Sequence, residues 1–364
     1  MNGNDPALQV LIDRVQSARS ANAQLRIRGG GSKDFYGETP QGELLDTRVL
    51  EGTSSYEPTE LVVTTRCGTA LAELEALLAQ NGQCLPFEPP HFAQGSTVGG
   101  MVAAGLAGPA RAAVGSVRDY VLGATLLNGH GEVLSFGGQV IKNVAGYDVS
   151  RLLAGSMGTL GVILEVSLKV LPVAPATATL RYQMPQAEAI ARLNRWGGQP
   201  LPLNASAWWD GTLIVRLRGA LAAVQSAIEK MGGDVIEPQF ATPFWEGMRN
   251  HDDEFFTKAQ AAVASGGALW RLSLPPTTAP LPLSGEQLIE WHGAQRWLCT
   301  AMPASNVRDV VAKAGGHATL FMAASKLAGA FAPLKSPLDR IHRELKKSFD
   351  PTGVFNPGRM YPGL

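Results

Sequence analysis

Three glycine clusters within the first 165 residues constrain the fold of this chain more than any other feature. The first, Arg28–Lys33, has the sequence Arg-Gly-Gly-Gly-Ser-Lys and directly follows a short predicted strand, Leu25–Arg28. The second is Gln94–Gly100 and the third is Gly155–Gly161. Glycine lets a backbone bend tightly and approach a bound molecule closely. Three such clusters among predicted strands therefore indicate an extended ligand that meets the backbone at several points.

The first cluster has the composition of an anion-binding loop. Several backbone N–H groups that point into one concavity bind a diphosphate well, and glycine permits that arrangement. Ser32 adds a hydroxyl donor, while Arg28 and Lys33 supply positive charge. The run matches neither the Rossmann pattern that opens a helix nor a Walker A loop. A flexible turn is the alternative for three adjacent glycines taken alone. If the loop does bind a nucleotide, a nucleotide-binding fold of another type is required.

Length and composition exclude several classes of protein. A chain of 364 residues is long enough for two domains with separate cores. Lys+Arg and Asp+Glu both number 31, so the basic excess typical of a nucleic-acid binder is missing. The three cysteines, Cys67, Cys84 and Cys299, form no CxxC pair, which predicts no metal or iron–sulfur site held by this chain alone. No apolar run reaches the roughly 18 residues of a membrane-spanning helix.

The prolines Pro172 and Pro175, which close a predicted strand, mark the expected domain boundary. The strongest elements before that point are a helix at Pro6–Ala21, a strand at Leu61–Thr65, a helix at Thr69–Gln80 capped by Thr69, strands at Tyr120–Leu127 and Glu132–Phe136, and a strand at Val162–Leu171. Asn128-Gly129 between two of these strands is a strong hairpin signal.

In the second half of the chain, predicted strands alternate with predicted helices. Its expected strands are Thr177–Tyr182, Ala205–Trp208, Leu213–Arg218, Trp270–Leu274, Gln295–Thr300 and His317–Phe321, and its expected helices are Gln186–Trp196, Leu221–Met231 and Ser336–Phe349. This alternation predicts a small α+β domain with an antiparallel sheet. The predicted division is 1–172, 173–335, and a C-terminal helix and tail at 336–364 that returns to the first domain.

Longer segments of the chain resemble a known family, the FAD-linked oxidases of the vanillyl-alcohol-oxidase and p-cresol-methylhydroxylase type. The similar segments are Ser116–Gly123, Gly137–Asp148, Leu153–Ile163 and Phe349–Arg359, and they are most like the D-lactate and glycolate dehydrogenase branch. The resemblance implies an α+β fold: a PCMH-type (VAO-like) FAD-binding domain of two subdomains, plus a small α+β cap domain with an antiparallel sheet.

The short length of the chain and the sequence of Lys142–Asp148 resemble those of the smaller flavin subunits of bacterial glycolate oxidases. That resemblance implies an FAD-dependent oxidoreductase that oxidises a small 2-hydroxy acid, glycolate to glyoxylate. It also implies two partners, a larger FAD-binding subunit and an iron–sulfur subunit that receives the electrons. The expected location is the cytoplasm, with membrane contact only through those partners.

The resemblance implies noncovalent FAD held by all three clusters. Arg28–Lys33 would hold the pyrophosphate, and Gly95–Gly100 would follow the ribityl chain. Ser116 and Asp119 would lie on the same cofactor surface, and Gly155–Val162 would surround the adenosine. The expected cofactor-binding residues are Arg28, Gly29, Gly30, Gly31, Ser32, Lys33, Gly95, Thr97, Val98, Gly99, Gly100, Ser116, Asp119, Gly155, Gly158, Gly161 and Val162. Covalent relatives use a His, Cys or Tyr, and the nearest such residues here are Cys84 and His91.

Catalytic residues are harder to assign. Oxidation of a 2-hydroxy acid needs a cation for the carboxylate and a base for the hydroxyl proton. The related dehydrogenases carry a GDGNxH motif, which is missing here, and usually a glutamate where this chain has Met157. The candidates are His317 and, from the resemblance, Lys142 and Arg359. The resemblance implies that Lys142 and Arg359, with Asn143, Tyr147 and Asn356, approach the isoalloxazine or the substrate side. We interpret His317 as a strand-end histidine, the alternative being a residual base. A self-sufficient D-2-hydroxyacid dehydrogenase and a flavin-binding interaction subunit without turnover stay open as alternatives.

Overall fold

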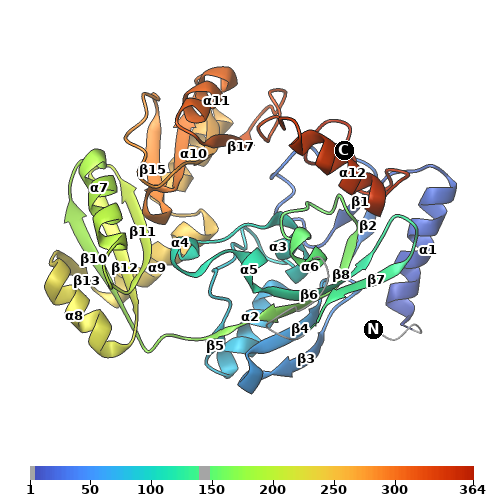
Figure 1. Cartoon of the computed structure of the whole chain (residues 1–364), viewed down its shortest axis with the longest axis horizontal. Helices are drawn as coiled ribbons and strands as arrows, with labels where there is room; N and C mark the ends of the chain where they lie inside the picture. Colours follow the sequence, from blue (N-terminus) through green and yellow to red (C-terminus); the bar gives the residue numbers. More distant parts are fainter. Residues whose placement is uncertain (1–4, 139–147) are drawn as a thin grey trace. The chain divides into compact units, whose positions relative to one another are not determined.

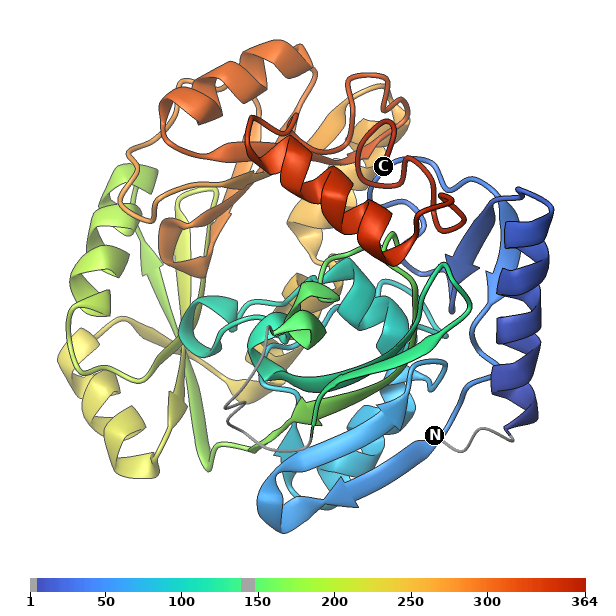
Figure 2. The same cartoon turned by 45° about the vertical axis from the view of Figure 1, so that its right-hand side comes forward.

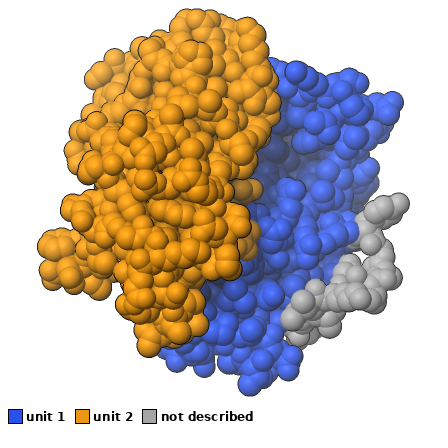
Figure 3. Space-filling model, turned by 60° about the vertical axis from the view of Figure 1, so that its left-hand side comes forward, with its two compact units in different colours: residues 1–106, 116–172, 333–364 blue, residues 107–115, 173–332 orange. Residues whose placement is uncertain are grey.

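Two large sheets and two two-stranded sheets organise the residues that the structure describes, 5–138 and 148–364, in this computed structural model (Figure 1). The chain divides into two units (Figure 3). Unit 1 comprises residues up to 106, 116–172 and 333–364, and unit 2 comprises 107–115 and 173–332.

One part of the predicted division needs correction. Residues 107–115, expected in the first domain, belong to unit 2. The indole N–H of Trp291 donates to the Gly108 carbonyl at 3.1 Å, and the Arg111 guanidinium lies 4.4 Å from the Trp291 ring centre. These contacts attach the short helix α4 (Arg111–Val114) to unit 2. Local periodicity carries no information about such distant partners.

Unit 1 is built on a five-stranded antiparallel sheet in the order β3-β4-β8-β6-β7. Its strands are β3 (Thr53–Glu57), β4 (Val62–Arg66), β6 (Val121–Leu127), β7 (Val133–Gly137) and β8 (Val162–Lys169). The predicted β6–β7 hairpin is confirmed. Asn128 closes it, because its side-chain oxygen accepts from the N–H groups of His130 and Glu132.

Smaller strands and helices complete unit 1. A parallel pair, β1 (Leu25–Arg28) and β2 (Glu43–Asp46), lies beside the helix α1 (Pro6–Ser20) in Figure 2. Asp5 caps the N-terminus of α1. The buried residues of this helix recur at helical spacing and pack in one core with Leu25 and Phe355; they are Leu8, Leu11, Val15 and Ala18. The other elements are α2 (Leu71–Gln80), β5 (Gln83–Cys84), α3 (Val98–Ala104), α5 (Val117–Tyr120), α6 (Val149–Leu152), β9 (Leu171–Pro172) and α12 (Leu338–Phe349).

The predicted Thr69 cap of α2 is wrong. The N-cap is Ala70, which has no polar side chain, and Thr69 is fully buried. Its hydroxyl instead accepts from the Gly52 N–H at 2.9 Å. A nearby turn with an unpaired donor therefore competed successfully for the hydroxyl that sequence spacing assigns to the helix end.

Unit 2 contains an eight-stranded antiparallel sheet in the order β13-β10-β12-β11-β15-β16-β14-β17. Its strands are β10 (Ala176–Gln183), β11 (Leu203–Trp209), β12 (Thr212–Gly219), β13 (Asp234–Ile236), β14 (Ala268–Ser273), β15 (Glu286–Glu290), β16 (Gln295–Thr300) and β17 (His317–Ala323). Its longer helices are α7 (Gln186–Gly197), α8 (Leu221–Met231), α9 (Pro238–Asn250), α10 (Glu254–Ala264) and α11 (Ala304–Lys313). The predicted antiparallel sheet is confirmed, and β13 and β15 are additional strands.

An aromatic cluster in unit 2 packs against the ring of half-buried His251. Its ring stacks on Phe256 with 3.9 Å between ring centres and meets Trp297 edge-on at 4.7 Å. Burial lowers the pKa of His251 to about 3. Two residues along, burial raises the pKa of Asp253 to about 6.

These two residues give opposite pH dependences of stability. Between pH ~6.5 and ~3, unfolded His251 binds a proton that folded His251 does not, so stability falls as the pH falls. Between pH ~6 and ~3.8, Asp253 has the reverse effect. Below about pH 6.5, we expect the unfolding free energy of His251→Phe to fall less steeply with falling pH than that of wild type. The unfolding free energy of Asp253→Asn should fall more steeply. Urea titrations from pH 3.5 to 7 measure both slopes, and equal slopes in the two variants would contradict the assignment.

Candidate functional site

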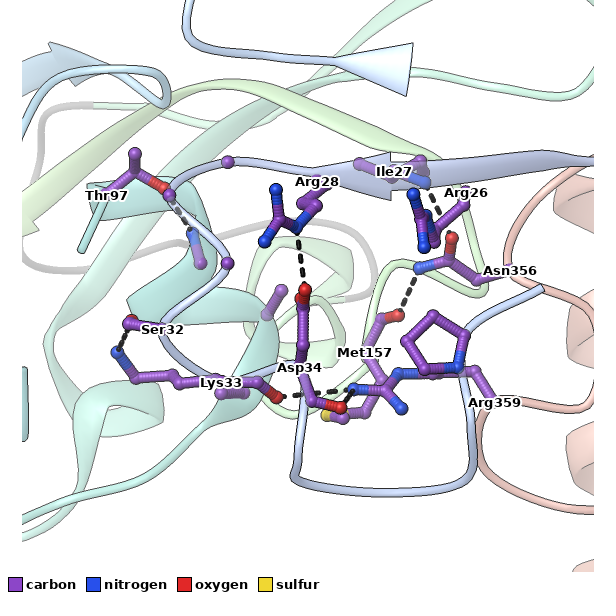
Figure 4. Close-up of a pocket in the computed structure, with 17 residues that line it drawn as sticks. Arg26, Ile27, Arg28, Ser32, Lys33, Asp34, Thr97, Met157, Asn356 and Arg359 are labelled. Carbon is purple, nitrogen blue, oxygen red and sulfur yellow. Dashed lines mark hydrogen bonds and ion pairs between the residues drawn. The ribbon is translucent and has the colours of Figure 1, made fainter. Parts of the chain in front are cut away.

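A hollow in unit 1 is lined by the loop after β1, the helix α3 and the C-terminal tail (Figure 4). A second hollow shares six of its lining residues: Ile27, Gly29, Gly100, Ala103, Met157 and Asn356. The second also includes Gly99, Gly158 and Gly161. Because they share these walls, the two hollows form one depression, here called the groove. All three glycine clusters therefore contribute to it.

The first and second clusters pack too closely to admit side chains. A Cβ atom on Gly30 would overlap the carbonyl group of Gly95, and one on Gly29 would overlap the side chain of Thr97. Gly30 therefore lets the loop after β1 lie directly against the segment that leads into α3. Thr97 caps that helix by accepting from the Gly100 N–H at 3.2 Å.

The loop presents a row of unused hydrogen-bond donors. In the described part of the chain, none of the backbone N–H groups of Gly29, Gly30, Gly31 and Ser32 donates a hydrogen bond. The four residues are half-buried, so their N–H groups are open to water or to a bound molecule. In contrast, the N–H groups of Val98 and Gly99 are used within the fold. The first cluster is thus suited to donate to an anion, whereas Val98 and Gly99 of the second cluster are already used by the fold.

Positive charge lines the same region. Arg26, Arg28, Lys33 and Arg359 border the first hollow, and the carboxylate among its lining residues is that of Asp34. Asp34 pairs with Arg28 at 2.7 Å. Lys33 is buried, with its ammonium 2.8 Å from the Ser96 hydroxyl. An anion in the groove would therefore meet a cationic surrounding.

The C-terminal tail joins the first cluster to the third. It runs beside β1, where Leu25 donates to the Val354 carbonyl at 2.7 Å and accepts from the Asn356 N–H at 2.9 Å (Figure 2). The side chain of Asn356 accepts from the Ile27 N–H and donates to the Met157 carbonyl, both at 2.7 Å (Figure 4). One buried amide thereby links two segments that border the groove.

A buried ion pair holds the tail in this conformation. The Lys346 ammonium on α12 lies 2.6 Å from the Asp350 carboxylate and donates to the carbonyls of Thr159 and Phe355. Asp350 also accepts from the N–H groups of Val354 and Phe355. Burial lowers the pKa of Lys346, and the nearby carboxylate opposes that shift. The pair therefore connects α12, the tail and the third cluster.

Arg359 is the tail's charged contribution to the groove. One terminal nitrogen, Nη2, donates to the carbonyls of Lys33 and Asp34 at 3.3 and 3.1 Å. The other, Nη1, is buried and has no partner among the described residues, and the whole side chain is only 6% exposed. Burial lowers the pKa of Arg359 to about 10, so the side chain is still charged at neutral pH.

Several predicted cofactor residues lie outside the groove lining. Val98 and Val162 are fully buried in the core, and Gly95 and Gly155 are not among the lining residues. Ser116 and Asp119 form a capping box on α5, with the Ser116 N–H donating to Asp119 at 2.7 Å.

The candidate catalytic residues do not lie together in one site. His317 is exposed at the start of β17 in unit 2, where it pairs with Ser273. Partial desolvation of the His317 ring by neighbouring atoms lowers its pKa, with a smaller contribution from Arg271. Arg359 lines the groove. Lys142, with the neighbouring Asn143 and Tyr147, lies outside the described residues.

Neither candidate for a covalent flavin link borders the groove. The His91 ring nitrogen lies 2.9 Å from the Glu75 carboxylate, and Cys84 is in β5. Arg26 also lines the groove and was not among the expected residues, although the two-residue period of a strand places it on the same face as Arg28.

No described helix has the length and apolar character needed to cross a bilayer. Residues 5–138 and 148–364 also contain no group of three or more His, Cys, Asp or Glu side chains that could hold a metal ion.

Comparisons with known proteins point in one direction. The family described as FAD binding domain matches residues 8–137. Glycolate oxidase subunit GlcE of Escherichia coli (strain K12) is 46% identical over 356 residues, covering 98% of each chain. The Archaeoglobus fulgidus D-lactate dehydrogenase is 31% identical over 43% of this chain and 35% of its own length. Glycolate oxidase subunit GlcD of Bacillus subtilis is 29% identical over 48% of this chain and 40% of its own.

A solved structure supports the same fold. Alkyldihydroxyacetonephosphate synthase matches with a TM-score of 0.66 at 15% sequence identity, over 96% of this chain and 75% of that one. The expected PCMH-type, VAO-like fold is therefore confirmed. Given the near full-length identity to one relative, the chain belongs to the family of glycolate oxidase subunit GlcE and is an FAD-dependent oxidoreductase.

Proposed function

We propose that this chain is the smaller FAD-binding subunit of a complex that oxidises glycolate to glyoxylate. Electrons would leave through flavin to an iron–sulfur subunit, and a larger flavin subunit would complete the assembly. The observation that carries the proposal is the row of unpaired N–H donors at Gly29–Ser32, set among cationic side chains. The near full-length relative named for glycolate oxidase supports the substrate.

The residues of the groove fit a noncovalent FAD. The N–H groups of the first cluster and the charges of Arg28, Lys33 and Arg359 suit a diphosphate. The close approach of Gly29 and Gly30 to the second cluster makes a cradle that side chains would fill. When bound, FAD supplies a hydride acceptor for the α-carbon of a 2-hydroxy acid.

The groove lacks an evident base, which supports dependence on partners. No histidine borders it within residues 5–138 and 148–364, and Asp34 is paired with Arg28. A partner subunit, or a residue outside the described ranges such as Lys142, would then take the hydroxyl proton. We also propose that the chain meets a membrane only through these partners.

A flavin reduction experiment tests the proposal. Under anaerobic conditions, the isolated FAD-loaded chain is mixed with glycolate or D-lactate, and the flavin absorbance is followed. We expect little bleaching alone and rapid bleaching in the complex with the larger flavin and iron–sulfur subunits. Dithionite serves as the control that the flavin can be reduced.

The alternatives predict different outcomes. Rapid bleaching of the isolated chain would instead identify a self-sufficient D-2-hydroxyacid dehydrogenase. A flavin that stays oxidised in the working complex would identify an interaction subunit without turnover. Because the larger subunit carries its own flavin, the comparison needs a complex in which this chain alone has lost FAD, for example through the Gly30→Ala variant.

A further inference from the structure

The guanidinium of Arg359 is held on one edge and unused on the other. Its Nη2 donates to the carbonyls of Lys33 and Asp34, while the buried Nη1 has no partner among the described residues. The backbone of Arg359 is fixed too, because its carbonyl accepts from the Glu38 N–H at 3.0 Å. Arg359 is only 6% exposed, so a charged donor there without an acceptor costs folding free energy unless a bound ligand accepts from it.

The chemistry of this region favours a phosphate oxygen as the missing acceptor. The backbone that holds Arg359, at Lys33 and Asp34, immediately follows the four unpaired N–H groups at Gly29–Ser32. Consecutive backbone donors and a planar guanidinium are both arrangements that bind phosphates in proteins. A substrate carboxylate would also satisfy Nη1, but it would leave most of the loop donors unused.

We propose that Arg359 binds the cofactor's diphosphate, and that docking of the tail and binding of the diphosphate are thermodynamically coupled. The inference rests on the proposed FAD site. Arg359 lies in the groove because the tail is docked there: Asn356 ties the tail to β1 and to the third cluster, and the Lys346–Asp350 pair holds its start. A ligand that binds only the docked form shifts the tail toward docking, and a docked tail binds that ligand more tightly by the same factor.

The test uses ligands that contain different parts of FAD. Binding of FAD, ADP and riboflavin to the apoprotein is measured by titration calorimetry for wild type, Arg359→Gln and Arg359→Lys. Arg48→Gln is the matched control, since Arg48 is exposed and pairs with Asp46 away from the groove lining. We expect Arg359→Gln to weaken FAD and ADP by about 10- to 100-fold and riboflavin not at all. Arg359→Lys keeps the charge and should recover part of the loss.

Tail docking is read separately by hydrogen exchange. ADP should slow the exchange of the Asn356 and Ile27 amides in wild type, and much less in Arg359→Gln. Unchanged ADP affinity in Arg359→Gln, with a raised KM for glycolate in the assembled complex, would assign Arg359 to the substrate carboxylate and overturn the inference. ADP binding does not depend on turnover, so a complex that binds FAD but ignores glycolate would refute the proposed function alone.

Discussion

Replacing Gly30 with alanine is expected to yield a folded protein that is purified without FAD. The added Cβ would overlap the Gly95 carbonyl, so the loop after β1 must move away from the second cluster. Overpacking of this kind costs about 1–3 kcal/mol. If the substitution destabilises the FAD-binding conformation of the loop by that amount, the affinity for FAD drops by up to about 100-fold.

The absorbance ratio of flavin to protein after purification measures the effect, with circular dichroism to check folding. Gly197→Ala is the control, because Gly197 is the exposed last residue of α7 and its Cβ would meet no atom within 4 Å. Full flavin content in Gly30→Ala would show that the tight contact between the first two clusters is not needed for the cofactor.

Asp350→Ala is expected to be the most destabilising substitution in unit 1. The substitution leaves the buried Lys346 ammonium without its counter-ion and the N–H groups of Val354 and Phe355 without their acceptor. Breaking a buried ion pair by removing one partner costs about 3–5 kcal/mol. Urea unfolding should register that loss, and FAD should dissociate more readily because the tail is no longer held.

Two further variants sharpen this result. Lys347→Met changes the exposed neighbour of Lys346 and should leave the unfolding free energy within about 0.5 kcal/mol of wild type. The double variant Lys346→Met/Asp350→Ala removes both charges and should recover part of the stability. If the single and double variants unfold alike, the uncompensated charge is not the source of the loss.

Local sequence signals identified the first cluster because its chemistry is contained in six consecutive residues. The β6–β7 hairpin was equally accessible, since Asn128-Gly129 encodes its own turn. The helix α3 was not, because Gly99 and Gly100 lie inside it and glycine is a poor helix former. Tertiary packing of α3 against β8, α2 and β4 overrides that preference.

The tail shows what sequence spacing cannot supply. Asn356 and Arg359 were identifiable as candidates by resemblance, yet their contacts are made with β1, Met157 and the loop after β1. Such contacts depend on the path of the whole chain and not on any local period. The same holds for residues 107–115, whose partner Trp291 lies far along the sequence.

The pairing of Asn356 with Ile27 spans 329 positions, which has a consequence for biosynthesis. A ribosome releases the first cluster early and the tail only after all of unit 2 has been made. Until then, the nascent glycine loop has neither Arg359 nor the amide bridge to Met157. Insertion of flavin should therefore be a late event in the maturation of this chain, after translation has passed Arg359.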